Sequence, residues 1–193
     1  MNTRILLIDN YDSFTYILRQ RLTEAGASFV EIAKNDNTHI PELAAGFDSI
    51  VFSPGPGTPE NGHVMFNILE KFYTSKRVLG ICLGHQAICT FFGATLINLQ
   101  YPMHGKKTKL KIYKSKKNIF SGIQDKIITG RYHSWVVSEK NFPDCLEITS
   151  VSGEGHIMSV AHKNYNITGI QFHPESYMTN TSLQILKNWI NME

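Results

Sequence analysis

Short apolar runs alternate with amphipathic stretches through the first half of the chain. Four apolar runs have the length of β-strands, and three stretches have helical patterns. The predicted strands are residues 5–8, 29–32, 50–52 and 78–81, and the predicted helices are residues 13–25, 64–73 and 86–92. Asp12 or Ser13 can cap the first helix. Strands that alternate with helices form a parallel sheet covered on both faces, so we predict an open, mainly parallel α/β fold of the flavodoxin-like kind.

The second half contains shorter segments in which apolar and polar residues alternate. Residues 107–113, 145–151 and 156–161 predict antiparallel strands, residues 167–172 a further strand, and residues 183–190 a closing helix. We therefore expect a small antiparallel sheet in this half. The lysines of residues 106–117 alternate with Leu110 and Ile112, which is typical of a strand with one solvent-exposed face. The chain contains no repeat or linker, and its 193 residues fit one domain, residues 1–193.

Composition and charge exclude several classes of protein. With 42% hydrophobic and 18% charged residues, the chain has the profile of a globular protein. A net charge of +3 is too small to indicate a nucleic-acid partner, and the chain has no membrane-length apolar run or signal-peptide core. We therefore expect a cytoplasmic protein with no membrane partner. The three cysteines lack the spacing of a disulfide framework or metal site, so neither a metal nor a cofactor is expected.

Cys82 is the strongest candidate for chemistry. It lies in the pentad G-I-C-L-G at 80–84, between a predicted strand and a helical stretch. A G-x-C-x-G sequence in that context places a nucleophile on a tight strand-to-helix turn, and its glycines allow the strained backbone. The helix start behind the sulfur favours the thiolate. Cys89 and Cys145 are expected to be packing residues, so we predict that Cys82 is the nucleophile.

A cysteine nucleophile needs a base and a group that orients the base. His173 and Glu175 supply both, because a spacing of two on extended chain puts the two side chains on one face. Pro174 lies between them and biases His173 toward extended geometry. The predicted triad follows the chain order Cys, His, Glu.

The segment S-P-G-P-G-T-P at 53–59 follows the predicted strand 50–52. Its three prolines have no N–H, so the donors inside the loop are the N–H groups of Gly55, Gly57 and Thr58. A stiff loop with few fixed donors suits an oxyanion hole. The second donor would be the N–H of Leu83, the residue after the nucleophile.

These segments resemble the motifs of class I (triad-type) glutamine amidotransferases: S-P-G-P-G-T-P at 53–59, G-I-C-L-G-H-Q at 80–86 and G-I-Q-F-H-P-E-S at 169–176. The resemblance implies the class I fold and a Cys82, His173 and Glu175 triad that hydrolyses glutamine through a thioester. The glutamine-binding residues that it implies are Gly55, Pro56, Gly57, Leu83, Gln86, Ser134 and Trp135. Trp135 stands where leucine is usual in the family. His85, His104 and His133 also lie in family motifs, and we expect no bond-breaking role for them.

Residues 9–16, 103–106 and 131–134 narrow the resemblance to the glutaminase subunits of anthranilate synthase and aminodeoxychorismate synthase. That likeness implies glutamine as substrate and a separate, large, chorismate-binding synthase subunit that receives the ammonia. Residues 135–143 and 157–162 favour the anthranilate branch of tryptophan biosynthesis, and the alternative is the folate branch or a subunit shared by both. A stand-alone cysteine γ-glutamyl hydrolase and a non-catalytic scaffold are less favoured, because residues 9–16 match the synthase branch and the triad positions are intact.

Overall fold

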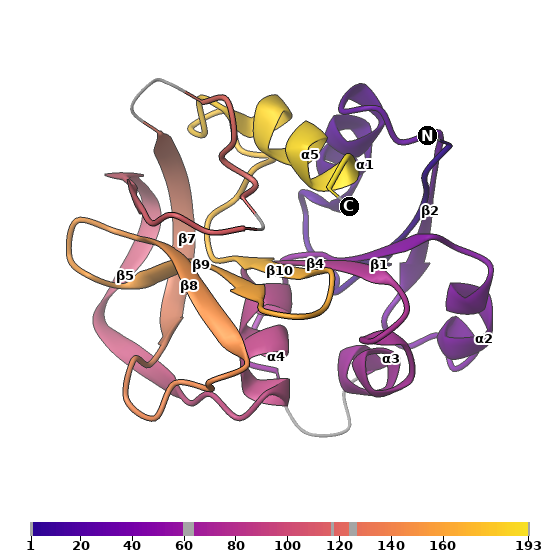
Figure 1. The fold of residues 1–193 in the computed structure, drawn as a ribbon, viewed down its shortest axis with the longest axis horizontal. Helices are drawn as coiled ribbons and strands as arrows, with labels where there is room; N and C mark the ends of the chain where they lie inside the picture. Colours follow the sequence, from indigo (N-terminus) through magenta and orange to yellow (C-terminus); the bar gives the residue numbers. More distant parts are fainter. Residues whose placement is uncertain (1, 60–63, 117, 124–126, 193) are drawn as a thin grey trace.

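The computed structural model describes residues 2–59, 64–116, 118–123 and 127–192. Among these residues, eight strands form one sheet (Figure 1). They are β1 (Arg4–Asp9), β2 (Phe29–Lys34), β3 (Ser49–Phe52), β4 (Arg77–Ile81), β6 (Lys111–Ile112), β8 (Leu146–Val151), β9 (Ile157–His162) and β10 (Ile167–Ile170). Their order is β2-β1-β3-β4-β10-β9-β8-β6. The pairs from β2 to β10 are parallel and those from β10 to β6 are antiparallel.

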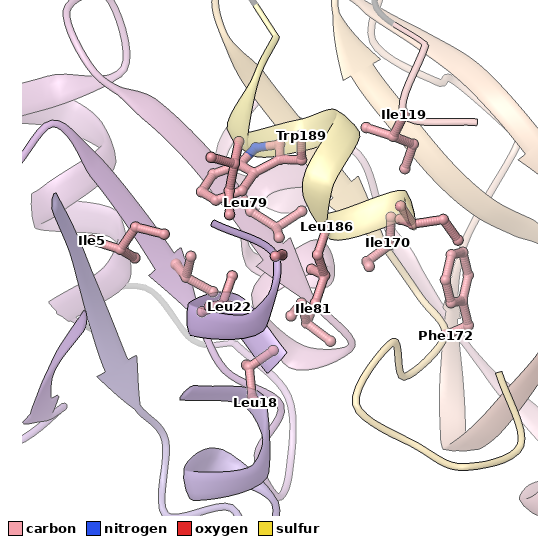
Figure 2. Close-up of a cluster of buried hydrophobic side chains, with 14 of the residues drawn as sticks. Ile5, Leu18, Leu22, Leu79, Ile81, Ile119, Ile170, Phe172, Leu186 and Trp189 are labelled. Atoms are coloured by element: carbon pink, nitrogen blue, oxygen red, sulfur yellow. The ribbon is translucent and has the colours of Figure 1, made fainter. Parts of the chain in front are cut away.

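Helices cover both faces of this sheet (Figure 1). They are α1 (Thr15–Glu24), α2 (Ile40–Ala45), α3 (Val64–Phe72), α4 (Leu83–Phe91) and α5 (Ser182–Ile190). Because side chains alternate along a strand, Ile5 and Leu7 of β1 pack with α1 and α5, where Trp189 is fully buried. Figure 2 shows this cluster. Leu6 and Ile8 of β1 pack with α2, α3 and α4 on the opposite face. Each such buried side chain contributes about 1.5–3 kcal/mol to folding.

A second, two-stranded sheet stands beside the main one (Figure 1). Its strands β5 (Leu96–Lys109) and β7 (Ile128–Val137) are antiparallel, with register shifts between Asn98 and Met103 and between His104 and Lys106. An isolated bridge joins Gly130 of β7 to His173, whose N–H donates to the Gly130 carbonyl at 3.1 Å. The second sheet is therefore attached to the segment that follows β10.

The fold class predicted from the sequence is confirmed, and several local details differ. The predicted strand 107–113 is divided, since β5 ends at Lys109 and β6 is a separate strand, with Leu110 buried and Ile112 exposed. Helix α1 begins at Thr15, and Asp12 accepts the Phe14 N–H at 2.8 Å instead of capping the helix. Helix α2, strand β7 and the first part of β5 were not predicted. Lys117, at the end of the lysine-rich segment, lies outside the described residues. No helix in the described part is long and apolar enough to cross a membrane.

Candidate active site

Three loops that follow adjacent parallel strands meet at one edge of the sheet. The strands β3, β4 and β10 are neighbours, and they are followed by the segment starting at Ser53, by Cys82 and by the segment starting at Gln171. Carboxyl ends of parallel strands are where ligands bind in such sheets. A cavity of about 520 Å³ lies there, within the range of ligand pockets. The residues that line it are Tyr11, Asp12, Ser13, Phe14, Pro54, Gly55, Pro56, Gly57, Cys82, Gln86, His104, Tyr132, His133, Ser134, Trp135 and His173.

Cys82 occupies a strained turn between β4 and α4. Its φ is 51° and its ψ is −99°, a conformation that is costly for a non-glycine residue. An added Cβ at Gly80 would collide with the Gly84 carbonyl, and one at Gly84 would lie 2.6 Å from the Phe52 Cβ. The Cys82 N–H donates to the Ile170 carbonyl at 2.8 Å. The two glycines thus allow the tight turn, and a neighbouring strand holds the backbone of Cys82 in place.

His173 and Glu175 form a buried pair. His173 Nδ1 and Glu175 Oε1 are 2.5 Å apart, and both side chains are almost inaccessible to solvent. Burial lowers the pKa of His173, but the Glu175 carboxylate and the Cys82 sulfur outweigh it and raise this pKa well above its ordinary value. With Nδ1 bonded to Glu175, Nε2 is the nitrogen left for the reacting groups, and it has no hydrogen-bond partner in the described structure.

The pairing of His173 and Glu175 arises differently from the extended chain expected from the sequence. The backbone turns after His173, and its carbonyl accepts the Ser176 N–H at 3.3 Å and the Thr179 hydroxyl at 2.6 Å. The ring of Tyr132 meets the His173 ring edge to face at 5.0 Å, and its hydroxyl lies 3.1 Å from Ser176 Oγ. The sequence did not single out Tyr132, whose contacts fix the orientation of the imidazole from the β7 side.

The segment that follows β3 is fastened to the end of β1. The Asn10 N–H donates to Ser53 Oγ at 2.8 Å, and Asn10 Nδ2 donates to the Ser53 carbonyl at 2.9 Å. An added Cβ at Gly55 would lie 2.6 Å from the Asn10 Cβ and 2.8 Å from Leu83 Cδ2. Gly57 has a φ of +76° and open space around its Cα. Gly55 is therefore fixed by close packing, whereas Gly57 has the room and the conformation that favour glycine.

The other residues expected to bind glutamine reach the cavity from α4 and β7. Gln86, Ser134 and Trp135 line it. Gln86 Nε2 donates to the Trp135 carbonyl at 3.0 Å and to Gln171 Oε1 at 3.2 Å. The Leu83 side chain is buried away from the cavity lining, but its N–H is the first of α4, and such N–H groups have no partner within their helix.

Two polar residues near the cavity were missed by sequence reasoning. Gln171 is fully buried, and its Nε2 donates to Cys82 Sγ at 3.6 Å. The sequence feature that could have identified Gln171 is its position two residues before His173. Asp12 lines the cavity, and burial raises its pKa, an effect that the Phe14 N–H and His173 partly offset.

Strand β7 carries a buried arginine next in the chain to the lining residues Tyr132 and His133. Arg131 is 1% exposed, and it donates to His133 Nε2 at 3.2 Å and to Glu154 Oε2 at 3.0 Å. Burial and the charge of Arg131 lower the pKa of His133 to about 3. Burial likewise lowers the pKa of His85 to about 3, and His85 does not line the cavity. A pKa this low keeps both histidines neutral at physiological pH, and the absence of a bond-breaking role for them stays a prediction. No cluster of described residues could hold a metal ion.

The chain is similar in sequence and in fold to known proteins. The sequence profile of the family described as "Glutamine amidotransferase class-I" matches residues 6–192. The chain is 41% identical to anthranilate synthase component 2 of Cyanophora paradoxa, over 97% of this chain and 98% of that protein. It is 38% identical to the aminodeoxychorismate/anthranilate synthase component 2 of Bacillus subtilis, over 96% and 95%. The crystal structure of a Thermoplasma acidophilum protein assigned to GMP synthase superposes with a TM-score of 0.83 and 28% identity, covering 98% of this chain and 93% of that one.

Proposed function

Because this chain belongs to the class I glutamine amidotransferases, we propose that it is the glutaminase subunit of anthranilate synthase. It hydrolyses the side-chain amide of glutamine and supplies ammonia to a large, chorismate-binding subunit. The observation that supports this most is a cavity lined by Cys82, by His173 with its Glu175 partner, and by six of the seven expected glutamine-binding residues, all but Leu83. A reducing compartment such as the cytoplasm suits its thiolate chemistry.

The proposed reaction begins with Cys82 as thiolate and His173 as imidazolium. The sulfur attacks the amide carbon of glutamine, and an S–C bond forms as the carbonyl oxygen gains negative charge. His173 Nε2 then gives its proton to the amide nitrogen, and the C–N bond breaks to release ammonia and leave a thioester. A water molecule attacks the thioester while His173 takes its proton, and the S–C bond breaks to yield glutamate and the thiolate.

The negatively charged oxygen of both tetrahedral intermediates would be held by backbone N–H groups. The donors we assign are those of Gly57 in the segment after β3 and of Leu83 at the start of α4, where the helix dipole adds to the attraction. Loss of one donor of this kind typically costs about 3 kcal/mol of barrier. Glu175 keeps the imidazole of His173 in the required orientation and stabilises its charged form.

The exposed residues at the rim of the cavity are consistent with the binding of a protein partner there. Tyr11 and Phe14 line it and are exposed. Two further exposed aromatic residues are close to lining residues in the chain: Tyr16, at 69%, follows Phe14 by two positions, and Tyr177, at 84%, follows His173 by four. Exposed aromatic residues clustered around a site are typical of protein interfaces. A large synthase subunit docked on this rim would cover the cavity and receive the ammonia, and we expect an interface of about 1,200 Å² or more.

Reconstitution tests the proposal. The chain is mixed with the large subunit of anthranilate synthase or of aminodeoxychorismate synthase from the same organism, and product formation is measured with glutamine and, separately, with ammonia. We expect glutamine-dependent anthranilate formation. Stimulation of aminodeoxychorismate formation alone would replace the assignment with the folate branch, and stimulation of both would identify a shared subunit. Full glutamine hydrolysis without any large subunit would favour the stand-alone hydrolase.

A further inference from the structure

We infer that Gln171 is a further catalytic residue, which donates a hydrogen bond to the sulfur of Cys82 and stabilises it as a thiolate. This inference rests on the proposed role of Cys82 as nucleophile. Gln171 follows β10 directly, is 0% exposed, and places Nε2 3.6 Å from Cys82 Sγ. A fully buried amide needs partners for its polar atoms, and here one partner is the reacting atom itself.

The orientation of the Gln171 amide follows from its neighbours. The nitrogen and oxygen of a glutamine side chain are distinguished by their hydrogen-bond partners. A backbone carbonyl can only accept, so the Gln86 atom 3.0 Å from the Trp135 carbonyl must be the nitrogen. That same NH₂ group lies 3.2 Å from Gln171, where it must meet an oxygen. The other end of the Gln171 amide, which faces Cys82, is therefore the NH₂ donor.

The reaction needs a donor at this point. The sulfur carries negative charge before it attacks and again when the thioester breaks down. A hydrogen bond to a charged acceptor is stronger than one to a neutral acceptor, so the NH₂ group of Gln171 favours the thiolate over the thiol. With Gln171, His173 and Glu175 at alternate positions, one short segment would supply the donor to the sulfur, the base and the group that orients the base.

The chain Trp135–Gln86–Gln171–Cys82 also gives Gln86 a second role. Both hydrogens of its NH₂ group are used by protein acceptors, so only its oxygen remains for a bound substrate. Gln86 acts on the sulfur through Gln171, which makes it a positioning residue in this respect. Removing Gln86 should therefore weaken the Gln171 donor without removing it.

The test measures how fast iodoacetamide alkylates Cys82 in the full chain as a function of pH, with mass spectrometry of the Cys82 peptide to separate it from Cys89 and Cys145. Gln171→Met keeps the approximate volume and removes the donor. We expect the pH midpoint of alkylation to rise by about one unit or more, because a hydrogen bond to a charged group is worth about one to two pH units. Gln184→Met is the matched control, since Gln184 lies exposed on α5, where its Nε2 donates to Asn188 Oδ1 at 2.8 Å. Its midpoint should equal that of the wild type.

A double-mutant cycle gives the second measurement. Gln86→Met should raise the midpoint by less than Gln171→Met, and the double variant should match Gln171→Met alone. Urea-unfolding transitions close to that of the wild type show that each variant is folded. An unchanged midpoint in folded Gln171→Met, while wild-type Cys82 reacts readily at neutral pH, would overturn the role of Gln171 and leave the proposed function standing. A wild-type Cys82 no more reactive than free cysteine would instead count against the nucleophile, and so against both.

Discussion

Replacing Glu175 by Gln keeps the shape of the side chain and removes its negative charge. In the native protein Glu175 Oε1 lies 2.5 Å from His173 Nδ1 in a buried pair. Burial lowers the pKa of His173, and Glu175 and Cys82 raise it well above its ordinary value. Without the carboxylate, both the charge attraction and the charged hydrogen bond of Glu175 are lost. The pKa of His173 should therefore fall, because burial lowers it and the Cys82 sulfur is left to oppose burial without Glu175.

The change in pKa sets how folding stability depends on pH. The wild-type native state keeps a proton that the unfolded chain releases above about pH 6.5. The stability contributed by the pair is fully present below that pH and is lost as the pH rises through the native pKa of His173. Below about pH 6.5, we expect the free energy of unfolding of the wild type to exceed that of Glu175→Gln by about 1.5–3 kcal/mol. Between that pH and the native pKa of His173, this difference should shrink by up to about 1.4 kcal/mol for each pH unit.

Urea unfolding of both proteins between about pH 6 and 8, where histidine titrates, measures this difference directly. Glu24→Gln is the control, because Glu24 forms an exposed ion pair with Arg21 at 2.9 Å, and neither partner changes charge in this range. Its effect should stay below about 1 kcal/mol and should not vary with pH. A wild-type advantage over Glu175→Gln that is constant with pH would show that His173 is not held as an imidazolium in the native state.

Four further outcomes are expected. Cys82→Ser should abolish glutamine-dependent synthesis and leave ammonia-dependent synthesis by the complex unchanged, because a serine hydroxyl is far harder to ionise; ordinary glutamine turnover would remove Cys82 as nucleophile. His173→Ala should reduce turnover more than Glu175→Gln, about 10⁶-fold against about 10⁴-fold in comparable triads, and a reversed order in kinetic assays would show that the roles are wrong. Gly84→Ala should lower the free energy of unfolding by about 1–3 kcal/mol, since its Cβ would lie 2.6 Å from the Phe52 Cβ. Gly153→Ala is the control and should change the free energy of unfolding little, because an added Cβ there would meet nothing within 4 Å. Equal melting curves for the two variants would contradict the packing argument. The isolated chain should be a poor glutaminase whose rate rises when the large subunit binds, and undiminished activity of the purified chain would refute this.

The central strands and the candidate triad could be predicted because their signals are local. Strands β1, β3, β4 and β10 are almost entirely buried, since both faces of the sheet are covered, and β1, β3 and β4 contain short apolar runs. Strand β7 could not be found in this way. It buries Arg131 and His133, and Arg131 bonds to His133 two positions along the strand and also to Glu154 and His156, which are distant in sequence. Helix α2 has six residues, too few for a periodic pattern.

Gln171 illustrates why some residues of the candidate site could not be predicted from the sequence. It lies inside a motif that already supplied His173 and Glu175, but its distinguishing contacts are with Cys82, 89 positions away, and with Gln86, 85 positions away. These contacts depend on β10 lying next to β4. No local sequence pattern predicts that pairing, because strands β5 to β9 lie between β4 and β10 in the chain. Tyr132 was missed for the same reason, because its contact with His173 depends on the bridge at Gly130.

The way each loop is held explains why acceleration by a partner is expected. Cys82 and His173 are fixed through their own N–H groups by the carbonyls of Ile170 and Gly130, so their positions follow from the sheets. The segment that carries the Gly57 donor is fixed at Ser53, by the Ile8 carbonyl of β1 and by Asn10, and at Gly55 by close packing, whereas an added Cβ at Gly57 would meet nothing within 4 Å. Asn10 is followed directly by the exposed Tyr11. A protein partner bound beside Tyr11 would therefore act next to the part of this segment that packing constrains least, and we expect it to raise the rate by favouring the orientation in which the Gly57 N–H points at the oxyanion.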